Sequence, residues 1–179
     1  MKLISVTQAL SPWNKFDGIP PAVLEAAKQR GQRLHAAAAA KLTGTFQVVP
    51  LLPEDVGYWL SLSDWIDSMV DHVYDVEPEL VEDKLGFVGH PDLICKINGK
   101  HYVVDWKTPA QESKSWRIQL GAYVHLAVRH YRHHSPIWRG MAVQPDRDGK
   151  LAKGTPYLAT ANDFGIFLSA LNCARYFGA

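Results

Sequence analysis

The segment Asp92–Lys107, DLICKINGKHYVVDWK, decides the fold of this chain, because it reads as two β-strands joined by a tight turn. Asn98-Gly99 lies between two runs rich in β-branched and apolar side chains, and this dipeptide favours a two-residue hairpin turn. Counting outward from the turn predicts the antiparallel pairs Ile97–Lys100, Lys96–His101, Cys95–Tyr102, Ile94–Val103, Leu93–Val104 and Asp92–Asp105. The predicted hairpin therefore brings two carboxylates face to face.

A lysine accompanies these two carboxylates. Side chains alternate between the faces of a strand, so Lys107 shares the face of Asp105 and lies diagonal to Asp92. Opposed carboxylates repel each other, and a divalent cation with oxygen ligands turns that repulsion into coordination. A lysine beside such an ion can orient a water molecule or stabilise negative charge, which suits attack on a phosphodiester. The alternative is a half-solvated hairpin in which both acids form salt bridges to the lysine and a bulge shifts the register.

The composition of the chain excludes several classes of protein. The chain has 179 residues, of which 47% are hydrophobic and 21% charged, and its net charge is +1. These values are typical of one globular domain, and the total charge indicates no partner. Two cysteines, Cys95 and Cys173, are too few for a disulfide framework, a four-thiolate zinc site or an iron–sulfur cluster. No apolar run approaches the roughly twenty residues of a membrane span, so we expect no membrane contact and a cytoplasmic location.

Hydrophobic periodicity and breaker residues predict four helices and five strands. The helices are expected at residues 22–42, 55–72, 116–133 and 162–176. The strands are expected at residues 74–82, 87–97, 100–106, 137–143 and 151–158. This order, with no internal repeat and no long linker, predicts a single mixed α/β domain.

Three motifs occur in a fixed order along the chain: Gly89-His90-Pro91-Asp92, then Asp105-Trp106-Lys107-Thr108, then Gln119-Leu120-Gly121-Ala122-Tyr123. Together with His35, which follows Arg30-Gly31, this set resembles the PD-(D/E)XK nuclease superfamily. More narrowly, it is similar to the RecB-like and phage-type exonuclease branch, which includes the mitochondrial genome maintenance exonuclease. Each motif alone is weak, whereas the ordered set is specific. One departure is Asp105, which stands where many members have Glu.

The resemblance implies an α/β fold with a restriction-endonuclease-like core, in which a central mixed β-sheet of about five strands is flanked by helices. It assigns residues 1–179 to a single nuclease domain. Within that domain, an N-terminal helical part covers residues 1–73, a catalytic core covers 74–158 and a C-terminal helix covers 159–179.

The resemblance also implies roles for individual residues. Asp92, Asp105 and Lys107 are the expected catalytic residues. The expected metal ligands are the side chains of His35, Asp92 and Asp105 and the main-chain carbonyl of Trp106, which would hold one or two Mg²⁺ or Mn²⁺ ions. A histidine on an apolar helix stripe is also an ordinary core residue, and for His35 this alternative stays open.

The segments before and after the hairpin in the sequence differ in charge. The stretch Glu54–Asp83 is acidic and contains Glu79, for which we expect a supporting role only. Residues 113–145 contain no acidic residue and several Lys and Arg residues, which favours phosphate binding; the alternative is an ordinary solvated helix face. We expect unpaired bases to stack on Trp116 and Tyr131. The full set expected to contact DNA is Arg30, Lys114, Trp116, Arg117, Gln119 and Tyr123.

The sequence thus predicts a metal-dependent DNA exonuclease that hydrolyses phosphodiester bonds of linear DNA in recombination, repair or phage DNA processing. The preference for DNA ends comes from the resemblance alone. Two alternatives are an endonuclease of the same superfamily and a non-catalytic nucleic-acid-binding module. Expected partners are the ends of duplex or single-stranded DNA, together with a recombination partner protein or further copies of the chain. A phage-encoded protein would act in the cytoplasm of its host cell.

Overall fold

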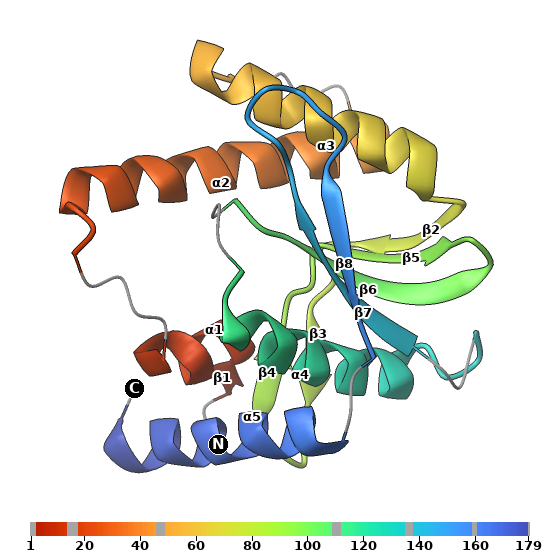
Figure 1. Ribbon diagram of the computed structural model, residues 1–179. Helices are drawn as coiled ribbons and strands as arrows, with labels where there is room; N and C mark the ends of the chain where they lie inside the picture. Colours follow the sequence, from red (N-terminus) through yellow and green to blue (C-terminus); the bar gives the residue numbers. More distant parts are fainter. Residues whose placement is uncertain are drawn as a thin grey trace.

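The structure, a computed structural model, describes residues 3–13, 18–45, 49–108, 112–134, 138–158 and 161–178. Its two β-sheets lie between helices (Figure 1). The elements are β1 (Ile4–Ser5), α1 (Val6–Leu10), η1 (Ser11–Trp13), α2 (Pro21–Thr43), η2 (Pro53–Asp55), α3 (Val56–Met69), β2 (His72–Val76), β3 (Leu80–Glu82), β4 (Phe87–Gly89), β5 (Leu93–Ile97), β6 (Lys100–Trp106), α4 (Lys114–His130), β7 (Trp138–Gln144), β8 (Lys153–Tyr157) and α5 (Ala161–Phe177). Residue 137 of one predicted strand and residues 159 and 160 of the predicted C-terminal segment lie outside the described ranges.

The larger sheet has five strands in the order β2-β5-β6-β7-β8. Strands β6 and β7 are parallel, and the other neighbouring strands are antiparallel. The helices α2 and α3 cover one face of this sheet, and α1, α4 and α5 lie on the other side (Figure 1). This arrangement confirms the predicted α/β fold with a mixed five-stranded sheet flanked by helices. None of the helices in the described ranges combines the length and apolar character needed to cross a membrane.

Two hydrophobic cores form on the two faces of the larger sheet because its side chains alternate. On β5, Leu93 and Cys95 pack with α2 and α3, whereas Ile94 packs with α1, α4 and α5. On β6, Val104 lies in the first core and Val103 in the second. Asp105, one step further along β6 than Val104, therefore lies on the side of α4.

The hairpin β5–β6 has the predicted register. All five pairs from Ile97–Lys100 to Leu93–Val104 are present. Asn98 and Gly99 both have positive φ angles, 48° and 72°, as a type I′ turn requires. The expected sixth pair is not part of the ladder, because the strand β5 begins at Leu93 and the side chain of Asp92 occupies the backbone position instead.

A second, smaller sheet has the order β1-β4-β3 and was not predicted. The predicted strands 74–82 and 87–97 are each divided between the two sheets, so these two predictions are wrong in extent. The divisions fall at Glu77-Pro78 and at His90-Pro91, where proline cannot supply the N–H that a continuous ladder needs. Strand β1 lies within residues 1–73, so this part of the chain is not purely helical.

Candidate active site

A cavity of about 310 Å³ lies beside Asp92, at the start of β5, and the last residues of β6. The residues that line it come from the beginning of α1, from α2, from the hairpin β5–β6 and from α4. The structure therefore brings together the predicted catalytic and metal-binding residues, namely His35, Asp92, Asp105, Trp106 and Lys107, with Gln119 and Tyr123, two of the residues expected to contact DNA.

Asp92 is buried, and both of its carboxylate oxygens have partners. The backbone amide of Trp106 donates a 2.6 Å hydrogen bond to Oδ2, and Oδ1 lies 2.8 Å from Nδ1 of His35. Burial and the nearby Asp105 carboxylate raise the pKa of Asp92, although His35 and the Trp106 amide act in the opposite direction. A buried site with two neighbouring carboxylates stabilises a bound cation.

His35 reaches the site from α2, which lies across the cavity from the hairpin. Burial lowers the pKa of His35, but the adjacent Asp92 carboxylate raises it by more, so the net shift is upward. The side chain keeps 34% of its surface exposed and lines the cavity, so it is not an ordinary core histidine. Its Nδ1 is directed at the same carboxylate that is the expected metal ligand.

Asp105, Lys107, Gln119 and Tyr123 form one hydrogen-bonded network. Nζ of Lys107 lies 2.5 Å from Oδ2 of Asp105 and donates a 2.6 Å hydrogen bond to Oε1 of Gln119. Nε2 of Gln119 donates in turn to Oδ1 of Asp105 at 3.3 Å and to the hydroxyl of Tyr123 at 3.1 Å. Gln119 and Tyr123 are four residues apart on α4 and so share one helix face. The network fixes the position of the lysine ammonium beside Asp105.

The phenol of Tyr123 remains protonated near neutral pH. Burial is the main cause that raises the pKa of Tyr123, and the nearby carboxylate of Asp105 adds to it. The hydroxyl of Tyr123 accepts the hydrogen bond from Nε2 of Gln119.

A third acid, Glu77, stands beside the cavity. Carboxylate and imidazole atoms of Glu77, His35 and Asp92 all lie within 4.8 Å of one another. Glu77 and Glu79 are both exposed, but Glu79 lies outside this group, and its carboxylate is 3.9 Å from Nε2 of His90. The supporting role expected for Glu79 stays a prediction, and Glu77 is the acid that the structure places beside His35 and Asp92. The sequence signal available was the acidic stretch as a whole; in the structure, Glu77 has a positive φ of 49° directly after β2.

A sequence model of the PD-(D/E)XK nuclease superfamily matches residues 13–164. The chain belongs to the PD-(D/E)XK nuclease superfamily. No curated protein matches the chain. Among solved structures, the crystal structure of SSO0001 matches with a TM-score of 0.45 and 15% sequence identity, covering 98% of this chain and 76% of that one.

PD-(D/E)XK nucleases use divalent metal ions, typically Mg²⁺ or Mn²⁺. The donor set of this PD-(D/E)XK nuclease fits such an ion, because His35, Glu77 and Asp92 offer an imidazole nitrogen and carboxylate oxygens within one small volume. Trp106 also lines the cavity, whereas its ring packs edge-on against Trp65 in the core below α3.

Three of the residues expected to contact DNA are buried in this PD-(D/E)XK nuclease. Gln119 and Tyr123 are bonded within the network of Asp105 and Lys107 rather than exposed to a nucleic acid strand. Trp116 is only 5% exposed, and Nζ of Lys107 lies 5.7 Å from its ring centroid. The expectation that bases stack on Trp116 is therefore wrong for this structure.

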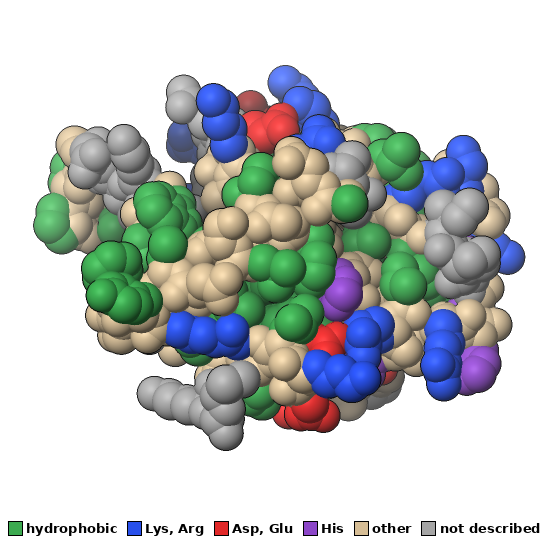
Figure 2. Space-filling view, turned by 90° about the horizontal axis from the view of Figure 1, so that it is seen from below, with side chains coloured by type: hydrophobic (Ala, Val, Ile, Leu, Met, Phe, Trp, Pro, Cys, Tyr) green, Lys and Arg blue, Asp and Glu red, His purple; other side chains and the backbone are tan. Residues whose placement is uncertain are grey.

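The predicted basic face is not one continuous surface. Arg117 is paired with Asp163 at 2.7 Å, and Arg129 is paired with Glu82 at 2.5 Å. On the face seen in Figure 2, Lys and Arg side chains stand apart around hydrophobic surface. Lys114 is exposed, whereas the guanidinium of Arg30 lies 4.8 Å from the ring of Tyr58 on α3.

Proposed function

We propose that this protein is a metal-dependent deoxyribonuclease that degrades linear DNA from its ends. One observation carries the proposal: the carboxylates of Asp92 and Asp105 meet His35 and Lys107 in a single cavity that opens to solvent. A non-catalytic binding module has no use for two buried acids and a lysine held against one of them. The preference for DNA ends rests only on the resemblance of the sequence to the RecB-like and phage-type exonuclease branch.

The reaction is hydrolysis of a phosphodiester, in which a water oxygen forms a new bond to phosphorus and one ester P–O bond breaks. When bound, the divalent cation acts as a Lewis acid and lowers the pKa of a coordinated water molecule. Asp92, His35 and Glu77 are placed to hold it, and Asp105 faces the same cavity. Lys107 stabilises negative charge on the phosphate oxygens, and Gln119 keeps its ammonium group in position.

The proposal includes one nuclease domain for residues 1–179, because both hydrophobic cores are built on the two faces of one sheet. We assign the activity to DNA recombination, repair or phage DNA processing, settings in which linear ends are degraded. A partner protein or further copies of the chain would act with it there, in the cytoplasm of the cell or of a phage host.

The test uses two DNA substrates, a linear duplex and the same DNA as a covalently closed circle, with Mg²⁺, with Mn²⁺ and with EDTA. We expect the linear form to be degraded in either metal, the circle to stay intact and EDTA to abolish degradation. Asp105→Asn and Lys107→Ala should each abolish most of the activity. Nicking of the circle would show an endonuclease instead, and salt-sensitive DNA binding without any product would show a binding module.

A further inference from the structure

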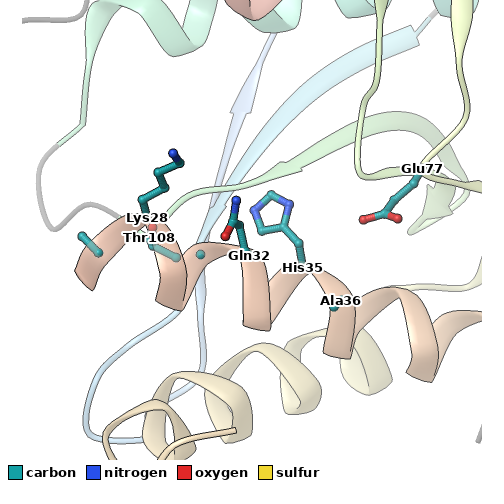
Figure 3. Close-up of a pocket in the computed structure, with 8 residues that line it drawn as sticks. Lys28, Gln32, His35, Ala36, Glu77 and Thr108 are labelled. Atoms are coloured by element: carbon teal, nitrogen blue, oxygen red, sulfur yellow. The ribbon is translucent and has the colours of Figure 1, made fainter. Parts of the chain in front are cut away.

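A second cavity of about 450 Å³ adjoins the active-site cavity. His35 lines both cavities, so they are neighbours at this residue. The second cavity runs along α2 toward its N-terminal end. Its lining consists of Ala27, Lys28, Gly31, Gln32, His35 and Ala36 from α2, together with Glu77 and Thr108 (Figure 3).

The polar side chains of α2 in this cavity share one helix face. Lys28, Gln32 and His35 are separated by four and three residues, the spacing that stacks side chains above one another. Figure 3 shows all three directed to the same side of α2, with the carboxylate of Glu77 facing His35 from across the cavity. The groove thus has an acidic end at the metal-binding residues and a basic end at Lys28.

Lys28 is the cation of α2 that remains available. Arg33 is bonded to Asp55, Lys41 to Asp67, and Arg30 lies against Tyr58, so these three cations contact η2 and α3. Within the described ranges, neither Lys28 nor Gln32 has a hydrogen bond or ion pair with another side chain. An ammonium and an amide that have no protein partner can bind a ligand without first losing an internal bond.

We propose that this groove binds the DNA strand that flanks the cleaved phosphodiester, with Lys28 contacting a backbone phosphate. The amide of Gln32 and the hydroxyl of Thr108 supply hydrogen bonds to the same stretch of backbone. This inference rests on the proposed nuclease function and adds the path of the substrate to it. It also moves the DNA contact on α2 from Arg30, the residue expected from the sequence, to Lys28.

The length of the groove agrees with this assignment. Seven residues of α-helix separate Lys28 from His35, a rise of about 10 Å. Successive phosphates of one duplex strand lie further apart than the axial rise of about 3.4 Å per nucleotide, because the strand also winds around the axis, so Lys28 meets a phosphate about one or two nucleotides from the metal-binding end. Gly31 lies between these residues and carries no side chain. A Cβ atom there would meet Oγ1 of Thr108 at 3.5 Å, an ordinary contact, so a larger residue fits the fold but occupies the groove.

The first experiment compares Lys28→Ala with Lys100→Ala. The control removes the same charge from the exposed turn at the far end of the catalytic hairpin. Steady-state degradation of linear DNA should show that Lys28→Ala raises KM about three- to tenfold and leaves kcat within about twofold. Lys100→Ala should match the parent protein in both constants.

The second experiment measures DNA binding by fluorescence anisotropy in the inactive Asp105→Asn background, at several salt concentrations. Adding Lys28→Ala should lower the slope of log Kd against log salt by about 0.9 for a duplex, or about 0.7 for a single strand. Adding Gly31→Leu should weaken binding without lowering the melting temperature, because leucine favours helix and the site accepts its Cβ.

The possible results separate the two levels of the proposal. If the parent protein cuts DNA while Lys28→Ala and Lys100→Ala behave alike in both experiments, the groove assignment is wrong and the nuclease function stands. If the parent protein never cuts DNA but Lys28→Ala still reduces the salt slope, the nuclease function is wrong and the strand path stands. A loss of kcat with unchanged KM in Lys28→Ala would also contradict a role in binding the flanking strand.

Discussion

The backbone amide of Trp106 donates a hydrogen bond of 2.6 Å to Oδ2 of Asp92, at the position where a sixth pair of the hairpin ladder is expected. A side-chain acceptor thereby replaces a main-chain carbonyl at the end of β5. On its other side, the carbonyl of Asp92 accepts a 3.1 Å hydrogen bond from the amide of Glu77, just beyond the last pair of β2 and β5. The backbone and the side chain of Asp92 thus bond to the segments that carry Glu77 and Trp106, and Oδ1 lies 2.8 Å from Nδ1 of His35. Asp92 therefore connects three of the candidate metal ligands.

Metal binding should be measurable without any nuclease assay, through Asp92→Asn. In the parent protein, Mn²⁺ at one hundred times its Kd should raise the free energy of unfolding by about 2.7 kcal/mol. The variant should show little of this increase, because the amide is a poor ligand for a hard cation. Differential scanning calorimetry with and without Mn²⁺ tests this, and an equal stabilisation of both proteins would exclude Asp92 as a ligand.

Without metal, the same variant should be at least as stable as the parent protein at neutral pH. Burial and Asp105 raise the pKa of Asp92, so the folded state of the parent disfavours the ionised form. That cost appears as the pH rises from the unfolded pKa, about 3.9, through the raised folded value. Asparagine carries no charge, and its side-chain oxygen can still accept from Trp106. Thermal melts in EDTA at pH 7 measure the effect, and a large loss of stability in Asp92→Asn would contradict it.

Gln119→Ala should separate a positioning role from a DNA contact. Gln119 bonds both Lys107 and Asp105 from a buried position, so its removal should loosen the ammonium group. We expect kcat on linear DNA to fall about tenfold with KM nearly unchanged, as for misplacement of a catalytic group. Lys107→Ala should cost more, about 100-fold or above. A rise in KM with unchanged kcat in Gln119→Ala would instead indicate that Gln119 contacts DNA, as the sequence predicts.

Glu77→Gln and Glu79→Gln form a matched pair for the acidic stretch before the hairpin. A carboxylate oxygen of Glu77 lies within 4.8 Å of donor atoms of His35 and Asp92, whereas Glu79 lies outside this group, beside His90. Glu77→Gln should weaken the affinity for Mn²⁺ about tenfold or more, the size of effect known for residues around a metal. Glu79→Gln should leave it unchanged. Titration of Mn²⁺ by isothermal calorimetry gives the Kd of each variant. A larger loss of affinity in Glu79→Gln than in Glu77→Gln would indicate that Glu79 supports the site.

The sequence alone predicts those parts of the site whose geometry depends on residues close together in the chain. The Asn98-Gly99 turn sets the register of β5 and β6, and the spacing of Gln119 and Tyr123 sets their common helix face. Counting along the chain can therefore place these residues correctly. The helix α2 is equally local, since Pro20 precedes it, Pro21 is its first residue and Gly44, with φ of 66°, ends it.

The features that the sequence missed depend on contacts between distant segments. The strand β1 has two residues, and it exists only because it pairs with β4 far along the chain. The burial of Trp116 comes from α1 and α5 packing around α4, which no periodicity in α4 itself reveals. Likewise, the sequence around Arg117 and Arg129, residues 113–145, contains no acid to pair with them. In the folded protein, Asp163 and Glu82 come from distant segments and form ion pairs with these two arginines.

The ion pair of Arg33 and Asp55 should stabilise the placement of α2. Asp55 is buried, and it accepts hydrogen bonds from the Arg33 guanidinium at 2.5 and 3.1 Å and from the amide of Leu52 at 3.1 Å. Because Arg33 is two residues from His35, this pair also fixes the helix that carries the candidate ligand. We expect Asp55→Asn to lower the free energy of unfolding by about 2–3 kcal/mol. Asp67→Asn, which breaks the exposed pair with Lys41, should cost less than about 1 kcal/mol.

The stabilisation by Asp55 should also depend on pH in a defined direction. Burial raises the pKa of Asp55, but the bonds from Arg33 and the Leu52 amide lower it by more, so the folded value lies below the usual one. The contribution is therefore complete above the unfolded pKa, about 3.9, and is lost as the pH falls through the depressed folded value. Urea unfolding of the parent protein and Asp55→Asn should show a constant difference from pH 7 to about pH 5 and a shrinking one below about pH 4. A difference that stays constant down to pH 3 would mean that the charge of Asp55 contributes nothing and that its packing accounts for the whole effect.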